Sequence, residues 1–169
     1  MGATFRAAET TVLVMSLPQP VGPPELAECY RTARTELVRL GFLLSGSHEV
    51  AEDAVQAAFA DAQRRWNTID NHRAYLRRAV TSRIHDTYRR AQRIRRLPGE
   101  TTALIGIAEL DETWHEVLAL PQRQREVVVL RFYEDMTLAD IASLLDRNPA
   151  TVRSDLHRAL THLRRTFHA

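Results

Sequence analysis

The stretch over residues 136–165 constrains the fold most strongly, because it reads as two helices joined by a tight turn. Thr137 is a suitable N-cap for the first helix, and Asp140 stands where it completes a capping-box pattern. Asn148 is a candidate N-cap for the second helix, with Pro149 at its first position. Apolar residues recur at helical spacing in both helices: Leu138, Ile141, Ala142 and Leu145, then Val152, Leu156, Ala159 and Leu163. The pattern predicts a helix-turn-helix whose second helix enters a major groove.

The side of the second helix opposite its apolar stripe is basic and polar. It carries Arg153, Ser154, His157, Arg158, Thr161, Arg164 and Arg165. Such a face suits contacts with the phosphates and base edges of duplex DNA. Basic helical hairpins also occur as plain packing units, and this segment taken alone leaves both interpretations open.

Charge is strongly segregated along the chain, although the net charge is only +2. All 23 basic residues are arginine; residues 64–96 hold 11 of them against 2 acids, and residues 147–169 hold 5 against 1. The intervening residues 97–146 are acidic, with 3 arginines and 10 acids. Two basic blocks separated by an acidic one favour two contacts with a single polyanion.

The rest of the chain also shows helical periodicity, without strand-like alternation or an internal repeat. Helices are predicted over residues 25–44, 49–66, 72–96, 114–120 and 122–133. A proline-rich stretch ends residues 1–24, which we predict to be a flexible leader whose true start is Met1 or Met15. We therefore predict an all-α fold of two small helical domains, 25–96 and 113–169, joined by a flexible linker, 97–112, with the helix-turn-helix in the second domain.

Aromatic residues are interleaved with arginines in the first domain. Trp66, Tyr75 and Tyr88 stand among Arg64, Arg65, Arg73, Arg77, Arg78, Arg83, Arg89 and Arg90. Rings that stack on bases and guanidinium groups that follow phosphates are what a single-stranded nucleic acid site requires. The alternative for each ring taken singly is a place in the hydrophobic core.

Acidic and amide side chains gather at the start of the helix predicted over 49–66. The group comprises Glu49, Glu52, Asp53 and Gln56, on a different face from the apolar stripe. Acids at this end also suit the helix dipole, and that role alone would explain them.

Several classes of function find no support in the residues. The sequence has no glycine-rich phosphate loop, and its 7 histidines are scattered without metal-ligand spacing. The single cysteine, Cys29, excludes an internal disulfide. Neither a signal peptide nor a membrane-length apolar run is visible. We therefore expect a cytoplasmic protein that is not an enzyme, with no metal, no cofactor, no small-molecule substrate and no membrane insertion.

Two parts of the sequence resemble bacterial RNA polymerase sigma factors of the extracytoplasmic-function (ECF) group, within the sigma-70 family. Residues 30–90 resemble the promoter-melting domain, through LVRLGFLLSGSHEVAEDAVQAAF (37–59), RRW (64–66) and NHRAYLRR (71–78). The second domain resembles the promoter-upstream domain, through LPQRQREVVVLRFYEDMTLADIA (120–142) and ATVRSDLHRAL (150–160). The resemblance covers about four-fifths of the chain, in the order and with the linker typical of the group.

The resemblance implies partners and site residues. Core RNA polymerase would be bound through its β′ clamp helices and its β flap, and the acidic helix would dock on the clamp through Glu49, Glu52, Asp53 and Gln56. The melted minus-10 strand, with one base flipped into a pocket, would contact Arg65, Trp66, Asn71, Arg73, Tyr75, Arg77, Arg78, Arg83, Tyr88 and Arg89. The minus-35 duplex would contact Arg147, Thr151, Arg153, Ser154, His157 and Arg158. An anti-sigma factor is a possible further partner.

The sequence departs from the group's usual pattern at four positions. Asp146 stands where the turn usually has glycine, and Asp tolerates a left-handed conformation better than most residues. Arg147 replaces an apolar residue, which indicates a looser turn or a phosphate contact. Ser82 replaces an asparagine involved in strand capture. Asp155 replaces a basic residue; we place it on the flank of its helix, where an ion pair with Arg158 is favoured over a contact with a cytosine amino group.

Two functions are weighed for the whole chain. The first is a sigma factor that gives RNA polymerase its promoter specificity in transcription initiation. The alternative is a stand-alone helix-turn-helix transcriptional regulator whose N-terminal bundle serves dimerisation or sensing. The basic block with interleaved aromatics favours the sigma factor, because a repressor needs no single-strand site. An adaptor that binds only proteins would leave both basic blocks unexplained.

Overall fold

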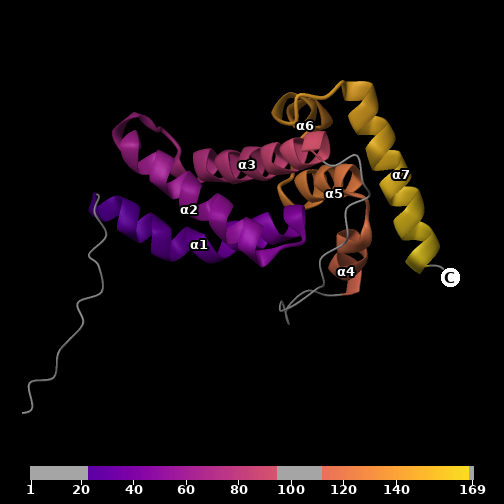
Figure 1. Ribbon diagram of the computed structural model, residues 1–169, viewed down its shortest axis with the longest axis horizontal. Coiled ribbons are helices and arrows are strands. Elements are labelled where there is room, and N and C mark those ends of the chain that lie inside the picture. Colours follow the sequence, from indigo (N-terminus) through magenta and orange to yellow (C-terminus); the bar gives the residue numbers. More distant parts are fainter. Residues whose placement is uncertain (1–22, 95–111, 168–169) are drawn as a thin grey trace, which may run out of the picture.

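The computed structural model describes residues 23–94 and 112–167, and within them every regular element is a helix (Figure 1). The elements are α1 (Pro24–Ser45), α2 (His48–Arg64), the short 3-10 helix η1 (Trp66–Thr68), α3 (His72–Ile94), α4 (Glu112–Ala119), α5 (Gln122–Val128), the π-helical turn η2 (Val129–Tyr133), α6 (Leu138–Leu144) and α7 (Pro149–Phe167). The predicted all-α class is confirmed. The predicted leader and linker lie almost wholly outside the described residues.

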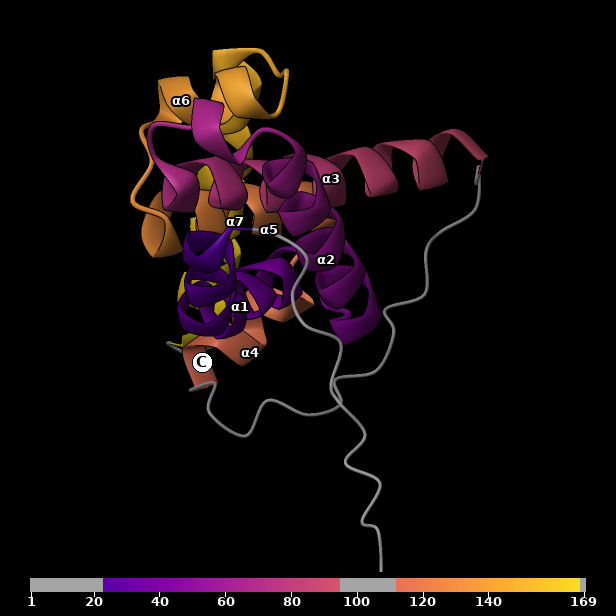
Figure 2. The ribbon, with the colours of Figure 1, turned by 90° about the vertical axis from the view of Figure 1, so that its left-hand side faces the viewer.

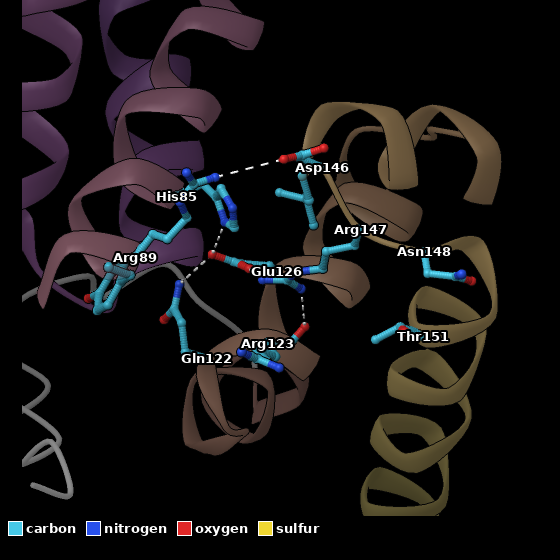
Figure 3. Close-up of a pocket in the computed structure, with 11 residues that line it drawn as sticks. His85, Arg89, Gln122, Arg123, Glu126, Asp146, Arg147, Asn148 and Thr151 are labelled. Carbon is cyan, nitrogen blue, oxygen red and sulfur yellow. Dashed lines mark hydrogen bonds and ion pairs between the residues drawn. The ribbon is translucent and has the colours of Figure 1, made fainter. Parts of the chain in front are cut away.

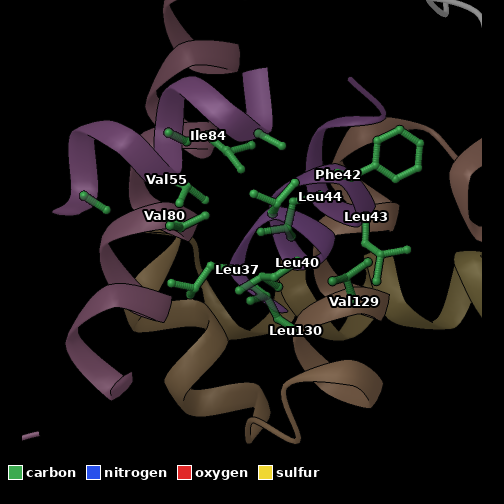
Figure 4. Packing of buried hydrophobic residues seen from close by; sticks show 14 of the residues in the cluster. Leu37, Leu40, Phe42, Leu43, Leu44, Val55, Val80, Ile84, Val129 and Leu130 are labelled. Atoms are coloured by element: carbon green, nitrogen blue, oxygen red, sulfur yellow. The ribbon is translucent and has the colours of Figure 1, made fainter. Parts of the chain in front are cut away.

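The first group of helices, α1 to α3, packs around a core of aliphatic side chains (Figure 4). Leu37 and Leu40 of α1, Val55 of α2, and Val80 and Ile84 of α3 are all at most 2% exposed. Small residues allow α1 and α2 to approach closely. A Cβ atom added at Gly41 would lie 2.9 Å from the Cβ of Ala51, so this crossing excludes any larger residue.

Local chemistry ends α1 and starts the next two helices where the sequence predicts. Gly46 has φ 72° and caps α1 in the left-handed conformation, and its backbone N–H donates to the carbonyl of Phe42. Ser47 accepts a hydrogen bond from the backbone N–H of Val50 and caps α2. Asn71 does the same for α3, through the backbone N–H of Ala74 at 3.0 Å.

The second group, α4 to α7, contains the predicted helix-turn-helix. Thr137 accepts a hydrogen bond from the backbone N–H of Asp140 and caps α6. Asn148 accepts one from the backbone N–H of Ala150 at 2.8 Å and caps α7, with Pro149 as its first residue. Asp146 has φ 48°, so the left-handed conformation expected in the turn is present. These three features were all predicted from the sequence.

Two helices differ from the prediction. The helix predicted over 49–66 ends as α2 at Arg64, and Trp66 begins the separate 3-10 helix η1. The stretch predicted as a single helix over 122–133 consists of α5 followed by the π-helical turn η2. Such turns insert an extra residue into the helix and shift the side chains that follow it. Val127 and Val128 at the end of α5 and Val129 and Leu130 in η2 are buried, whereas Phe132 in η2 is 57% exposed.

The two groups of helices lie against each other (Figures 1 and 2). Helix α1 contacts α4, α5 and η2, and α5 also packs on α7. Figure 2 shows the C-terminal turns of α3 projecting beyond the other helices. The division of the chain into two domains at 97–112 stays a prediction, since the structure describes the two groups in contact. Among the helices described, none combines the length and the apolarity needed to cross a membrane.

Candidate nucleic-acid and polymerase interfaces

Helix α7 presents its basic face outward. Its buried side consists of Val152, Asp155, Ala159 and Leu163. Arg153, His157 and Arg158 are exposed, as is Thr151, and Ser154 is half-buried. In Figure 1, α7 lies at the edge of the molecule, away from α1 to α3. Five of the six residues predicted to contact the minus-35 duplex therefore lie on accessible parts of one helix.

A groove runs beside this face. It has a volume of about 650 Å³ and lies between α7 and the joint of α4 with α5. His157, Arg158, Thr161, His162 and Arg165 line it on the α7 side. The basic character of α7 therefore continues around the flank of the helix, where DNA phosphates would lie if the exposed face entered a major groove.

Arg147, the sixth of these residues, is placed differently. Its guanidinium forms an ion pair with the carboxylate of Glu126, and its Nη1 also donates to the carbonyl of Arg123 at 3.3 Å (Figure 3). The Arg147 side chain is only 13% exposed. The guanidinium thus holds the turn of the helix-turn-helix against α5 and is only slightly accessible, and the predicted phosphate contact stays a prediction. The turn is well packed rather than loose.

Asp155 also differs from its prediction. It is 6% exposed, and its Oδ2 atom is buried without a hydrogen-bond partner. No ion pair with Arg158 forms among the described residues. The position on the flank of α7 was correct, but this flank is covered by the helices packed on it, α4, α5 and α6. A buried carboxylate can reach neither phosphate nor a base edge.

The start of α3 and the turn before it are held by Trp66. The ring is 7% exposed and stacks on the ring of His72, with centroids 3.7 Å apart. His72 Nε2 also lies 3.0 Å from the Trp66 carbonyl. Trp66 therefore belongs to the core, which was the alternative weighed for it, and it presents no free ring face for a base. Asn71 is exposed but engaged as the cap of α3.

The arginines of α3 whose side chains are described fall into three sets. Arg89 pairs only with the second group of helices, with its Nη1 3.9 Å from Oδ2 of Asp146. Some are engaged in ion pairs within the first group of helices: Arg77 with Glu36, Arg83 with Asp61, and more loosely Arg73 with Glu36 at 3.9 Å. Others, Arg78 and Arg90, are exposed, together with Arg65 just before the helix. Of the aromatic residues, Tyr75 is half-buried, and the Tyr88 hydroxyl donates to the carbonyl of Ser45 at 2.5 Å. The accessible part of the predicted minus-10 site is therefore smaller than its ten residues.

The acidic group on α2 is accessible. Glu49, Asp53 and Gln56 are exposed, and they lie on one side of the helix at spacings of three and four residues. Glu52 is half-buried and forms an ion pair with Arg34 of α1 at 2.6 Å. The structure therefore leaves three of the four predicted polymerase contacts free, and it assigns the fourth a role in joining α1 to α2.

Sequence reasoning missed a cluster of buried polar groups at the contact between the two groups of helices. Arg125 is 7% exposed and Glu126 is 2% exposed, although both lie in a stretch that reads as a charged surface. Burial lowers the pKa of Arg125, while the nearby Tyr88 and Glu126 oppose this effect. Burial alone would raise the pKa of Glu126, but the hydrogen bonds from His85 and Gln122 and the charge of Arg147 outweigh it and hold that pKa below its usual value.

A cavity of about 220 Å³ lies at this contact (Figure 3). It is lined by His85, Tyr88 and Arg89 of α3, by Gln122, Arg123 and Glu126 of α5, and by Leu145, Asp146, Arg147, Asn148 and Thr151 of the helix-turn-helix. Within the described residues, no group of three or more His, Cys, Asp or Glu side chains is arranged to hold a metal ion.

Comparison with known proteins gives matches along most of the chain. The family described as Sigma-70 region 2 matches residues 29–94, and the family described as Sigma-70, region 4 matches residues 110–163. The RNA polymerase sigma-E factor of Streptomyces coelicolor is 33% identical over 150 residues, which cover 83% of this chain and 84% of that protein. The ECF RNA polymerase sigma factor SigW of Bacillus subtilis is 24% identical over 155 residues, which cover 78% of this chain and 83% of that protein.

A solved structure has the same fold. It is the sigma factor RpoE of Bartonella quintana, in complex with the anti-sigma factor NepR. The match has a TM-score of 0.60 at 19% sequence identity and covers 86% of this chain and 98% of that chain. The similarity therefore includes both groups of helices.

Proposed function

Because the chain belongs to the ECF group of sigma-70-family RNA polymerase sigma factors, we propose that it divides promoter recognition among three of its surfaces. As a sigma factor it directs RNA polymerase to promoters in transcription initiation. The proposal assigns residues to each step. The exposed face of α7 contacts the minus-35 duplex, the exposed arginines of α3 contact the melted minus-10 strand, and the acidic face of α2 docks on core polymerase.

The observation that carries this proposal is the orientation of α7. The helix follows a well-packed turn, buries Val152, Ala159 and Leu163, and leaves Arg153 and His157 exposed on the opposite side. A helix anchored in this way can enter a major groove without moving its own core. Arg153 is the strongest candidate for a base contact, because a guanidinium can bind a guanine edge through two hydrogen bonds.

The minus-10 assignment rests on the exposed cations of the first group of helices. Arg65 and Arg78 are exposed and have no acidic partner among the described residues. Two such charges suit the backbone of a single strand, which binds largely through its phosphates. The proposal does not include base stacking by Trp66, because that ring is buried.

The acidic face of α2 supports the polymerase assignment. Glu49, Asp53 and Gln56 are exposed on a helix whose other side is packed on α1 and α3. We place this action in the cytoplasm, where RNA polymerase works. We also propose that an anti-sigma factor binds the chain, because the structural relative RpoE was solved in complex with one, NepR.

The test separates the two DNA surfaces in a holoenzyme reconstituted with core polymerase. Promoter fragments are first selected from genomic DNA by the holoenzyme, and two probes are made from them: the minus-35 duplex and the minus-10 single strand. Arg153→Ala should weaken duplex binding by about 1–3 kcal/mol. Arg78→Ala should weaken single-strand binding and reduce its salt dependence by about 0.7 units.

Each variant should leave the other probe unaffected. Arg31→Ala serves as the control, because Arg31 is an exposed arginine of α1 far in sequence from both surfaces. It should bind both probes like the wild type. If Arg153→Ala and Arg78→Ala weaken both probes equally, the division into two DNA surfaces is wrong.

A further inference from the structure

The groove beside α7 is basic on one wall and neutral on the other. Apart from Thr161, its α7 wall consists of basic and titratable side chains: His157, Arg158, His162 and Arg165. The opposite wall, at the joint of α4 with α5, consists of Ala119, Pro121 and Gln124. Among the described residues that line the groove there is no carboxylate. A hollow whose charges share one sign concentrates ions of the opposite sign, so this groove is suited to an anion.

The basic side chains of the α7 wall have no acidic partner in the part of the chain that the structure describes. All four are exposed, and none takes part in an ion pair. His157 and His162 accept hydrogen bonds from the hydroxyls of Thr161 and Thr166, but these bonds use the backbone carbonyls. Arg147, in the turn before this helix, differs because its guanidinium is already paired. The groove therefore offers donor groups that the fold itself does not use.

The groove follows the flank of α7 that adjoins its outward side. Counted from the centre of the buried side, Arg153 lies about 100° away in one direction. Arg158, His162 and Arg165 lie about 80–140° away in the other direction. When a helix lies in a major groove, the base edges face its outward side and the phosphates of a strand pass along its flank. The basic wall therefore lies where a strand would pass if Arg153 reads a base.

This wall is long enough for more than one phosphate. Arg158 and Arg165 are separated by seven positions, which corresponds to roughly 10 Å along a helix. Consecutive phosphates of one DNA strand follow each other at about 3.4 Å of rise along the duplex. His162 stands between the two arginines in the sequence and on the same flank. One strand can therefore contact both guanidinium groups and the imidazole between them.

The walls of the groove favour a sugar-phosphate backbone over an acidic protein segment. A protein partner gains most of its affinity from large side chains buried in well-packed pockets. The neutral wall offers only Ala119, Pro121 and Gln124 for such contacts. A backbone needs cations and hydrogen-bond donors, and the α7 wall supplies both.

Histidine gives this groove a dependence on pH that arginine cannot give. Imidazole gains a proton near pH 6.5, whereas guanidinium stays charged. The titratable and charged groups of the α7 wall are His157, Arg158, His162 and Arg165, and the opposite wall, as far as the structure describes it, adds none. Phosphates beside an imidazole favour its charged form, so binding takes up a proton. The affinity gained in this way is complete below the ordinary pKa of imidazole and is lost as the pH rises through the higher pKa of the complex.

We propose that the groove holds backbone phosphates of the minus-35 duplex through Arg158, Arg165 and protonated His162, and that the affinity for the duplex therefore increases as the pH falls. His162 and Arg165 lie outside the six residues that the sequence assigns to this duplex. The proposal rests on the proposed function of α7 and extends it from the base edges to the backbone.

The experiment measures the affinity of the reconstituted holoenzyme for two labelled duplexes, the minus-35 duplex and one of scrambled sequence. Fluorescence anisotropy is recorded at about pH 6 and about pH 8, on either side of the ordinary pKa of imidazole. If the pKa of one imidazole rises by about one unit on binding, the wild type binds about 6-fold more tightly at the lower pH. Phosphates carry no sequence information, so both duplexes should show the same dependence.

Variants of His162 test the proton. His162→Gln should bind like the wild type at the higher pH and lose most of the gain at the lower pH. His162→Arg should bind tightly at both, because guanidinium stays charged. His115→Gln, which changes an exposed histidine of α4 outside the groove, should keep the wild-type dependence. A pH dependence of His162→Gln equal to that of the wild type overturns the role of His162.

A variant of Arg165 tests the phosphate contact. Arg165→Gln should weaken the binding of both duplexes by the same factor and lower the salt dependence by about 0.9 units. Arg31→Gln, on α1, should leave both quantities unchanged. Circular dichroism checks that the variants keep their helix content. An unchanged salt dependence overturns the phosphate contact. Weaker binding of core polymerase by Arg165→Gln, with unchanged duplex binding, shows that the groove takes a protein segment and also overturns it.

Arg153→Ala separates this proposal from the proposed function. If Arg153→Ala weakens binding of the minus-35 duplex and the groove variants do not, the groove proposal alone is wrong. If the groove variants weaken both duplexes and Arg153→Ala weakens neither, the backbone contact stands and the assignment of base contacts to this face of α7 is wrong.

Discussion

Removing the carboxylate of Glu126 should destabilise the protein far more than removing an exposed acid. The side chain is 2% exposed and is paired with Arg147, whose own side chain is 13% exposed. Breaking a buried ion pair by deleting one partner costs about 3–5 kcal/mol, because the other charge is left buried. Arg147 keeps one acceptor, the carbonyl of Arg123 at 3.3 Å, so we expect Glu126→Ala to cost about 2–3 kcal/mol.

The assay is thermal and urea unfolding followed by circular dichroism. For a chain of this size the loss corresponds to a fall in melting temperature of about 5–10 °C. Glu126→Leu combined with Arg147→Leu should recover most of it, because a hydrophobic pair of similar volume often replaces a buried ion pair without loss. Glu28→Ala, which removes an exposed ion pair with Arg31, should leave the melting temperature unchanged.

The pH dependence gives a second measurement of the same interaction. The folded pKa of Glu126 lies below its ordinary value of 4.5, so its stabilisation is complete above that value. It is lost as the pH falls through the lower, folded pKa. Glu126→Gln should therefore be less stable than the wild type near neutral pH and should approach it in acid. A constant difference at all pH values, or a double variant whose loss equals the sum of the single losses, would refute the reasoning.

Two further predictions concern other surfaces. Asp53→Arg combined with Gln56→Ala should lower the affinity for core polymerase, because both side chains are exposed on the acidic face of α2. A pull-down measures the binding. Unchanged binding by a variant of normal helicity would contradict the assignment. Asp155→Leu should raise the stability by about 1–2 kcal/mol, because it removes a buried oxygen that lacks a hydrogen bond. Unfolding measurements check this, and weaker binding of the minus-35 duplex by the variant would show that Asp155 has a role in DNA recognition.

Local chemistry made the helix boundaries predictable. Ser47, Thr137 and Asn148 each cap a helix through a hydrogen bond to a backbone N–H within three residues. Their roles therefore depend only on residues close to them in the sequence. Gly46 adopts the left-handed conformation that ends α1 for the same reason. The π-helical turn η2 was not predictable in this way. It lies in a mainly apolar stretch interrupted only by Arg131, where neither a cap nor a breaker marks the change of hydrogen bonding.

The buried charges of α5 were not predictable from local pattern. Arg125 and Glu126 stand in the segment QRQRE, which on a single helix reads as a solvated face. Their burial comes from partners that are far away in the sequence, such as Ser45 for Arg125 and His85 for Glu126. The composition of residues 97–146 shows that the segment is acidic. It does not predict which of its charged side chains are buried against the other group of helices.

Helical periodicity predicts the direction in which each side chain of α7 points, but it does not predict which flanks of the helix are buried. Counting about 100° per residue from Val152 placed Asp155 about 60° away, on the flank, and this position is correct. Whether a flank is buried depends on the neighbouring helices, and the packing of α4, α5 and α6 on α7 buries this one. Arg153 and His157 lie on the side away from that packing, so their exposure follows from periodicity and is independent of which helices cover the flanks. Among the polar residues of α7, these two therefore have the best-supported assignment to DNA.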